Sequence, residues 1–181
     1  MSAQIGVAAA ALAAALVLPA AAGAQAGHAH GSGLAVPASI EAEHREIHAA
    51  LEAATREPGR VGAAARALAE VLDPHFVREE QIALPPLGLL APLAAGERPA
   101  GTAAALAMTD SLRRELPRML EEHGRIRSAV AALRTAAHAA GAAEARRFAD
   151  ELALHARTEE EVLYPAALLM GDVLRARQGG R

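Results

Sequence analysis

Histidine and glutamate recur at one fixed spacing in two distant stretches of the sequence. Residues 75–85 (HFVREEQIALP) and residues 155–165 (HARTEEEVLYP) both read H-x-x-x-E-E-x-x-x-x-P. In a helix, a histidine and a glutamate four residues apart lie one turn apart on the same face. Imidazole nitrogens and carboxylate oxygens are common metal ligands. Each stretch therefore offers half of a metal site: His75 with Glu79, and His155 with Glu159.

A second pattern adds one histidine to each half of the chain. Glu43-His44 and Glu122-His123 both begin the pattern E-H-x-x-I. His123 lies 79 residues after His44, and His155 lies 80 residues after His75. Matched spacings of this kind indicate an internal repeat of two helical hairpins.

The elements that would position these residues are helices. The chain has 181 residues, of which 52% are hydrophobic and only 2% aromatic, and alanine and leucine are strong helix formers. Apolar periodicity, proline and glycine predict helices near residues 37–57, 60–84, 102–139 (or 109–139) and 142–164. Residues 85–101 form a long connection, and Pro165 opens a short final segment. The fold class is all-α: a four-helix bundle with a pseudo-two-fold internal repeat.

If the repeated faces point inward, four histidines and two glutamates meet at the centre of the bundle. Burying them without partners would cost roughly 1–3 kcal/mol for each polar group, and metal ions remove that cost. Nitrogen and oxygen donors favour iron or manganese over copper or zinc in a two-metal arrangement. Two histidines, two bridging carboxylates and a bridge from solvent would make each ion five-coordinate. One position would stay open for dioxygen, peroxide or nitric oxide.

Each motif alone has an ordinary structural explanation. A single H-x-x-x-E is a common surface pair, and a single histidine on an apolar stripe is often a core residue. Two such motifs in register, each preceded by a histidine in the stripe, favour the metal interpretation because independent signals agree.

At these residues the sequence resembles the hemerythrin-like, or HHE cation-binding, domains, and the resemblance covers residues 37–174. It implies an up-down-up-down bundle around a non-haem di-iron centre, two iron ions with an oxo or hydroxo bridge. Glu79 and Glu159 would be the bridging carboxylates. Carried over position by position, the metal ligands would be His44, His75, Glu79, His123, His155 and Glu159.

The sequence departs from the oxygen-carrying hemerythrins, which use a fifth histidine four residues after the one on the third helix. Arg127 stands at that position, and the carboxylate of the fourth helix is Glu159 at spacing four. A more symmetric centre follows, which puts stable oxygen carriage in doubt. His48, four residues after His44, is either a fifth histidine ligand or a residue at the edge of the stripe.

Several other residues have weaker signals. Tyr164 either lines the mouth of the site or packs in the core, and His138 is expected on the surface. His28 and His30 offer loose metal binding or a solvated tail. The glutamates that follow the ligand carboxylates either orient histidines or form a solvated face; they are Glu80, Glu160 and Glu161.

The ends of the chain are expected to lie outside the bundle. Residues 1–26 contain an apolar run and a small-x-small site, which is typical of an export signal and predicts an exported or periplasmic protein. An uncleaved membrane anchor and a cytoplasmic protein with a mis-assigned start remain alternatives. Residues 27–36 are expected as a flexible linker, 37–177 as the bundle and 178–181 as a disordered tail.

Composition restricts the possible functions. There is no cysteine, so disulfides, thiolate metal sites and cysteine nucleophiles are excluded. The net charge of −3 without a basic cluster predicts no nucleic-acid partner, and we expect no stable membrane insertion of the mature protein. The oligomeric state is not indicated.

Three functions remain open. The first is binding of, or reaction with, a small ligand (dioxygen, peroxide or nitric oxide) at a di-iron centre, for sensing or stress protection. The second is iron buffering without catalysis, and the third is a metal-free helical interaction module. Whether the protein is an enzyme is left open.

Overall fold

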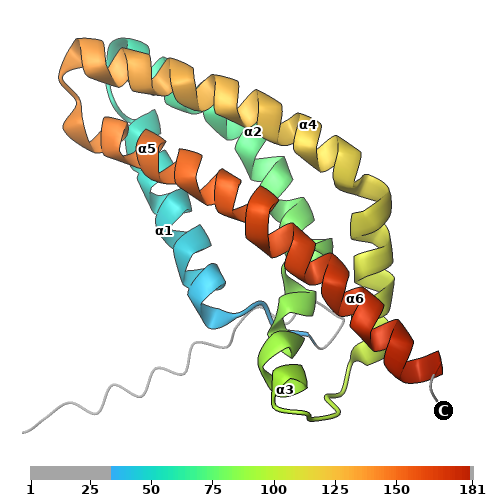
Figure 1. The fold of residues 1–181 in the computed structure, drawn as a ribbon. Helices are drawn as coiled ribbons and strands as arrows, with labels where there is room; N and C mark the ends of the chain where they lie inside the picture. Colours follow the sequence, from blue (N-terminus) through green and yellow to red (C-terminus); the bar gives the residue numbers. More distant parts are fainter. Residues whose placement is uncertain (1–33, 180–181) are drawn as a thin grey trace, which may run out of the picture.

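The structure is a computed structural model that describes residues 34–179. Its long helices are α1 (Ala38–Thr55), α2 (Gly59–Ile82), α4 (Thr102–Ala140) and α5 (Ala143–Thr158), and the described residues contain no strand. Figure 1 shows these helices packed side by side along much of their length. The all-α class and the helical bundle are therefore confirmed.

The helix ends follow local sequence signals. Glu41 lies in the first turn of α1, where a negative charge interacts favourably with the helix dipole. Gly141 ends α4 with a φ of 67°, a left-handed conformation that glycine adopts without steric cost. Its N–H donates to the carbonyl of His138 at 3.2 Å, and the N–H of Ala142 donates to the carbonyl of Ala137 at 2.9 Å. The chain can then reverse into α5.

The four long helices form a closed ring of neighbours: α1 and α4 each pack against both α2 and α5. The interior contains two separate apolar clusters. The first includes Leu51, Leu68 and Leu133, and the second includes Leu112 and Met170. Glu79 on α2, His123 on α4 and His155 on α5 lie between these clusters along the chain, which makes them part of a polar layer with apolar packing on both sides.

The connection between α2 and α4 is more ordered than the sequence indicates. It contains a 3₁₀ turn (Pro85–Leu89) and the short helix α3 (Leu90–Ala94). Pro85, Pro86, Leu87 and Leu89 are buried in the 3₁₀ turn, which contacts α2, α4 and α6. The connection thus closes one end of the bundle.

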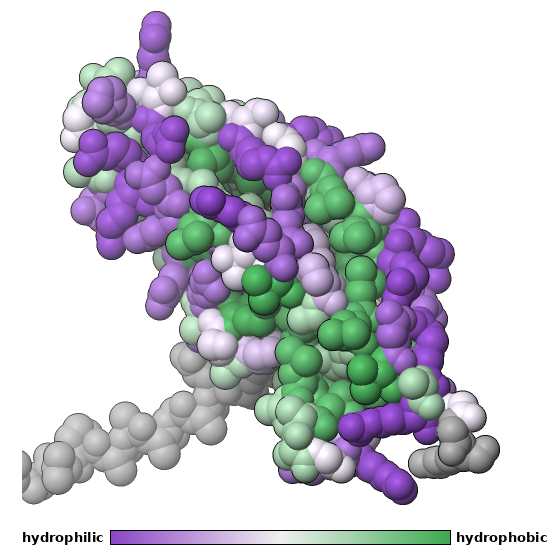
Figure 2. Space-filling view, viewed as in Figure 1, coloured by the Kyte–Doolittle hydropathy of each residue, from purple (hydrophilic) through white to green (hydrophobic). Residues whose placement is uncertain are grey.

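The last helix differs from the prediction. Pro165 does not open a separate segment, because the chain continues from α5 through a π-helical turn (Glu159–Leu163) into α6 (Tyr164–Gly179). Figure 1 shows α5 and α6 as one long run. Figure 2 shows apolar side chains gathered over part of the surface. The exposed apolar residues of this run include Val162, Leu169 and Val173.

The predicted export signal lies outside the described residues, as do His28 and His30 and most of the predicted linker. None of the helices within residues 34–179 has the length and apolar character needed to span a bilayer.

Candidate metal centre

The structure brings all six predicted ligands together inside the bundle. They come from α1, α2, α4, α5 and the first residue of the π-helical turn, and none is more than 3% exposed. Their ligand atoms form two groups that share one residue, Glu159.

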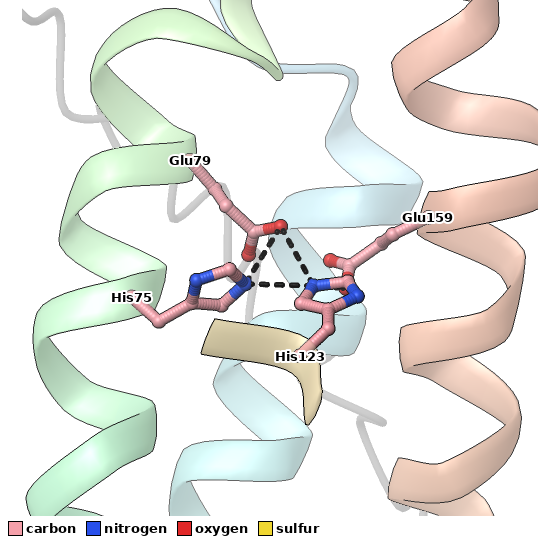
Figure 3. Close-up of side chains that lie close together, drawn as sticks. All are labelled: His75, Glu79, His123 and Glu159. Carbon is pink, nitrogen blue, oxygen red and sulfur yellow. Dashed lines mark hydrogen bonds and ion pairs between the residues drawn. The ribbon is translucent and has the colours of Figure 1, made fainter. Parts of the chain in front are cut away.

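The first group lies between α2 and α4, and we call it the α2/α4 group: His75, Glu79 and His123, together with Glu159. Figure 3 shows these four side chains converging from three directions. The Nε2 atoms of His75 and His123 are 2.8 Å apart. Glu79 Oε1 lies 3.4 Å from His75 Nε2 and 4.0 Å from His123 Nε2, and Glu159 Oε2 lies 3.5 Å from His123 Nε2.

The second group lies between α1 and α5, and we call it the α1/α5 group: His44, His155 and Glu159. Glu159 Oε1 is 2.8 Å from His155 Nε2 and 3.6 Å from His44 Nε2. The His44 ring stacks on Phe76, with ring centroids 4.3 Å apart. Glu159 therefore directs one carboxylate oxygen to each group, as a bridging ligand would.

Each of the four histidines has a glutamate from a neighbouring helix at its outward nitrogen, Nδ1. When Nδ1–H donates to a carboxylate, the lone pair of Nε2 is left pointing into the site, and the ring is held in place. The four pairs are His75 with Glu122 (3.0 Å), His123 with Glu160 (2.8 Å), His155 with Glu43 (3.1 Å) and His44 with Glu80 (3.5 Å).

Two of these outer glutamates were missed by sequence reasoning. Glu43 and Glu122 each precede a ligand histidine in the E-H-x-x-I pattern, but each contacts a histidine of a different helix. The repeated glutamate was the available signal. Glu160 takes the orienting role that the sequence left open, Glu80 lies within ion-pair distance of His44 without hydrogen-bond geometry, and Glu161 is exposed.

Tyr164 reaches further into the site than the sequence indicates. It is 1% exposed, and its hydroxyl donates a hydrogen bond to Glu79 Oε1. The hydroxyl oxygen of Tyr164 lies 3.0 Å from His123 Nε2 and 3.4 Å from His75 Nε2. Burial, with the charges of Glu79 and Glu159, raises the pKa of Tyr164, so in the metal-free protein the phenol keeps its proton.

The histidines have unequal proton affinities in the absence of metal. Burial alone would lower the pKa of His44, but the carboxylates of Glu159 and Glu80 raise it to about 9. For His75, burial is outweighed by Glu79 and Glu122, which also raise the pKa to about 9.

The second histidines of the two groups shift in opposite directions. Burial lowers the pKa of His123, and the nearby charge of His75 adds to that effect. The pKa of His155 is raised, because the carboxylate of Glu159 beside it outweighs burial.

The two carboxylates also differ. Burial and the neighbouring charge of Glu159 raise the pKa of Glu79 to about 7. Burial acts in the same direction on Glu159, but the imidazoles of His155 and His44 close to its carboxylate outweigh burial and hold the pKa of Glu159 well below its usual range.

These side chains fit a metal better than they fit one another. Both nitrogens of His44 and the Nε2 of His155 are fully buried without a hydrogen-bond partner. The same holds for Glu79 Oε2 and Glu159 Oε1, and the short distance from Glu159 Oε1 to His155 lacks hydrogen-bond geometry. Buried polar atoms rarely stay unpaired. Bound cations would satisfy those that face the centre.

Comparison with known proteins agrees with this donor set. Residues 35–167 match the hemerythrin HHE cation binding domain, which is well over half of the chain. The chain belongs to the hemerythrin family. Searches of curated proteins and of solved structures gave no match. Metal binding is thus supported both by the family and by the buried histidine–glutamate cluster.

In this hemerythrin domain the other two histidines of residues 34–179 lie outside the ligand groups. His48 is 46% exposed, and its Nδ1 lies 3.8 Å from Asp73 Oδ1, so it is not one of the grouped ligands. His138 is exposed. Arg127, at the position where the oxygen carriers have a histidine, pairs instead with Glu160.

Proposed function

We propose that this hemerythrin domain holds two iron ions in a non-haem dinuclear centre and binds or reacts with a small ligand: dioxygen, peroxide or nitric oxide. The observation that carries the proposal is the position of Glu159, whose two oxygens serve two adjacent groups of buried nitrogen and oxygen donors. When bound, iron at such a site polarises a small ligand or exchanges electrons with it.

The proposal includes an up-down-up-down bundle with pseudo-two-fold symmetry. It is supported by the outer glutamates, because the contact between His44 and Glu80 has its counterpart, about 80 residues later, in His123 and Glu160. The contact between His155 and Glu43 likewise has its counterpart in His75 and Glu122.

The chain itself contributes orientation and the exclusion of water. The outer glutamates hold the imidazole rings, and the apolar clusters on both sides of the polar layer keep bulk water out. A site of low dielectric strengthens the electrostatic effect of a bound ion on its ligand.

The test uses the full chain, loaded with iron and analysed for metal content. We expect two iron ions per chain and an absorption spectrum that changes on addition of azide, hydrogen peroxide or nitric oxide. Binding at about 1,000 times the dissociation constant stabilises a fold by about 4 kcal/mol. Removal of the iron should therefore lower the melting temperature by roughly 10 °C.

His75→Ala and His155→Ala should abolish most of this stabilisation, whereas His138→Ala, at an exposed histidine outside the cluster, is the matched control. If iron binds but is readily removed by a chelator, and its spectrum does not change with any of the three ligands, the function would be iron buffering instead. A chain that takes up no iron, with both alanine variants as stable as the wild type, would support the metal-free interaction module.

A further inference from the structure

Tyr164 places its hydroxyl oxygen among the ligand atoms of the α2/α4 group. The oxygen is in hydrogen-bond contact with Glu79 Oε1 and lies 3.0 Å from His123 Nε2 and 3.4 Å from His75 Nε2. The two imidazole nitrogens are 2.8 Å apart. Ligands about 2.0–2.2 Å from one ion lie at mutual distances of about 3 Å. The phenol oxygen is thus spaced as a member of such a shell.

The π-helical turn explains why a tyrosine at this position faces the site. In an α-helix a residue five positions after Glu159 would point about 140° away from it. Here the backbone N–H of Tyr164 donates to the carbonyl of Glu159, five residues earlier. That hydrogen bond widens the turn and brings Tyr164 back toward the face of Glu159. Pro165 follows, and because proline has no backbone N–H it cannot donate the hydrogen bond of a regular α-helix.

The other half of the sequence repeat has a five-residue backbone hydrogen bond at the corresponding position, but no π-helical turn and no tyrosine. At the end of α2, the N–H of Leu84 donates to the carbonyl of Glu79 at 3.0 Å, again over five residues, and Pro85 follows. Leu84 occupies the position that corresponds to Tyr164, and it is fully buried. An oxygen donor of this kind therefore exists in only one half of the repeat.

We propose that Tyr164 is a seventh protein ligand of the metal centre, bound through its phenolate oxygen to the ion held by His75 and His123. The inference rests on the proposed metal centre. On binding, the phenol O–H bond breaks, its proton leaves to solvent, and both electrons stay on the oxygen, which forms the bond to the metal. No electron is transferred. The charge of a bound ion reverses the local preference for the protonated phenol, and tyrosine is an established iron ligand in proteins.

An unequal centre follows from this assignment. The α2/α4 group would offer its ion two histidines, Tyr164, Glu79 and the shared Glu159, while the α1/α5 group would offer two histidines and Glu159. With fewer protein donors, the α1/α5 group would leave its ion more room for a small ligand, beside Phe76.

The chain offers a direct test because Tyr164 is its only tyrosine and it has no tryptophan. We would load the full chain with ferric iron and record the visible absorption and the resonance Raman spectrum. Tyrosinate ring vibrations, enhanced by excitation into a phenolate-to-iron charge-transfer band, can come only from Tyr164. Tyr164→Phe should remove this band and these vibrations completely while iron stays near two ions per chain, because the six other ligands remain.

Phe148→Leu is the control for disturbed packing. Phe148 is a buried aromatic side chain in the first apolar cluster, outside the ligand groups, and its replacement should leave the tyrosinate signals unchanged. Wild-type protein that binds two ferric ions without tyrosinate vibrations would overturn the role of Tyr164 and leave the dinuclear centre intact. Wild-type protein that binds no iron would instead overturn the proposed function.

Discussion

The α2/α4 group and the α1/α5 group share Glu159 and come from the same sequence repeat, yet their surroundings differ. In the α2/α4 group, Tyr164 donates to Glu79 beside the two histidines. In the α1/α5 group, the apolar ring of Phe76 stacks on His44. The counterparts in the repeat are Leu84 for Tyr164 and Ala156 for Phe76, and neither carries the same chemistry.

The difference extends to charge in the metal-free protein. Burial lowers the pKa of His123, while the carboxylate of Glu159 raises that of His155. Glu79 has a raised pKa and Glu159 a lowered one. A repeated sequence can therefore supply the same side chains twice and still build two groups that bind protons unequally.

The largest expected effect tests which carboxylate is shared. Glu159→Gln should reduce iron from two ions to fewer than one per chain, since Glu159 serves both groups. Glu79→Gln should leave about one ion, bound by His44, His155 and Glu159, because Glu79 belongs to only one group. At that group the loss of metal affinity should exceed the roughly 10–100-fold loss that follows removal of an outer-shell partner. Metal analysis after dialysis is the measurement. Equal losses in the two variants would contradict the assignment of Glu159 as the shared residue.

The next effect concerns the outer glutamates. Glu122→Gln should lower the affinity of the α2/α4 group for its ion by about 10–100-fold, because Glu122 orients His75. Glu43→Gln should lower the affinity of the α1/α5 group for its ion by a smaller factor. Glu43 is 51% exposed against 15% for Glu122, so water can replace its hydrogen bond. Competition with a chelator of known affinity measures both. A larger loss in Glu43→Gln would contradict the ranking.

The pH dependence of the metal-free protein involves one histidine of each group. His44 and His75 have a pKa of about 9 in the folded chain against an ordinary 6.5. Their stabilisation is fully present below pH 6.5 and is lost as the pH rises through 9. The pKa of Glu79 is raised from 4.5 to about 7, so ionisation of this carboxyl also makes the folded protein less stable as the pH rises. Urea denaturation with a chelator present should thus show a decreasing free energy of unfolding between pH 6.5 and 9.

His44→Gln and His75→Gln should each flatten part of this decrease. The affinity for metal should have the opposite sign and rise with pH, because protons compete with the ion for the imidazoles. A metal-free protein that becomes more stable between pH 6.5 and 9 would refute the charge distribution described for the two groups.

The smallest effect is expected at His48. Its side chain is 46% exposed and faces Asp73, outside both groups. His48→Ala should therefore leave the iron content and the absorption spectrum unchanged, with the exposed His138→Ala as reference. Loss of an ion in His48→Ala alone would make it the fifth histidine ligand after all and would enlarge the α1/α5 group.

Much of the fold follows from local sequence signals. Alanine-rich amphipathic segments, together with breaks such as Pro58-Gly59 and Gly141, predict the four long helices closely. The continuation of α5 into α6 was missed because proline normally ends or kinks a helix. In this chain the backbone N–H of Tyr164 donates to the carbonyl of Glu159 and widens the turn before Pro165, so the helix continues.

The sequence by itself determined which six side chains meet, because helical spacing and the repeat assign each of them to an inward face. Only the tertiary structure decided how they are grouped: His75 lies beside His123, and His44 lies with His155. It also decided that Glu43 and Glu122 support histidines on other helices and that Tyr164 enters the site. The physical reason is that periodicity assigns a residue to a face of its own helix, whereas contacts between helices depend on their packing and on the hydrogen bonding of one irregular turn.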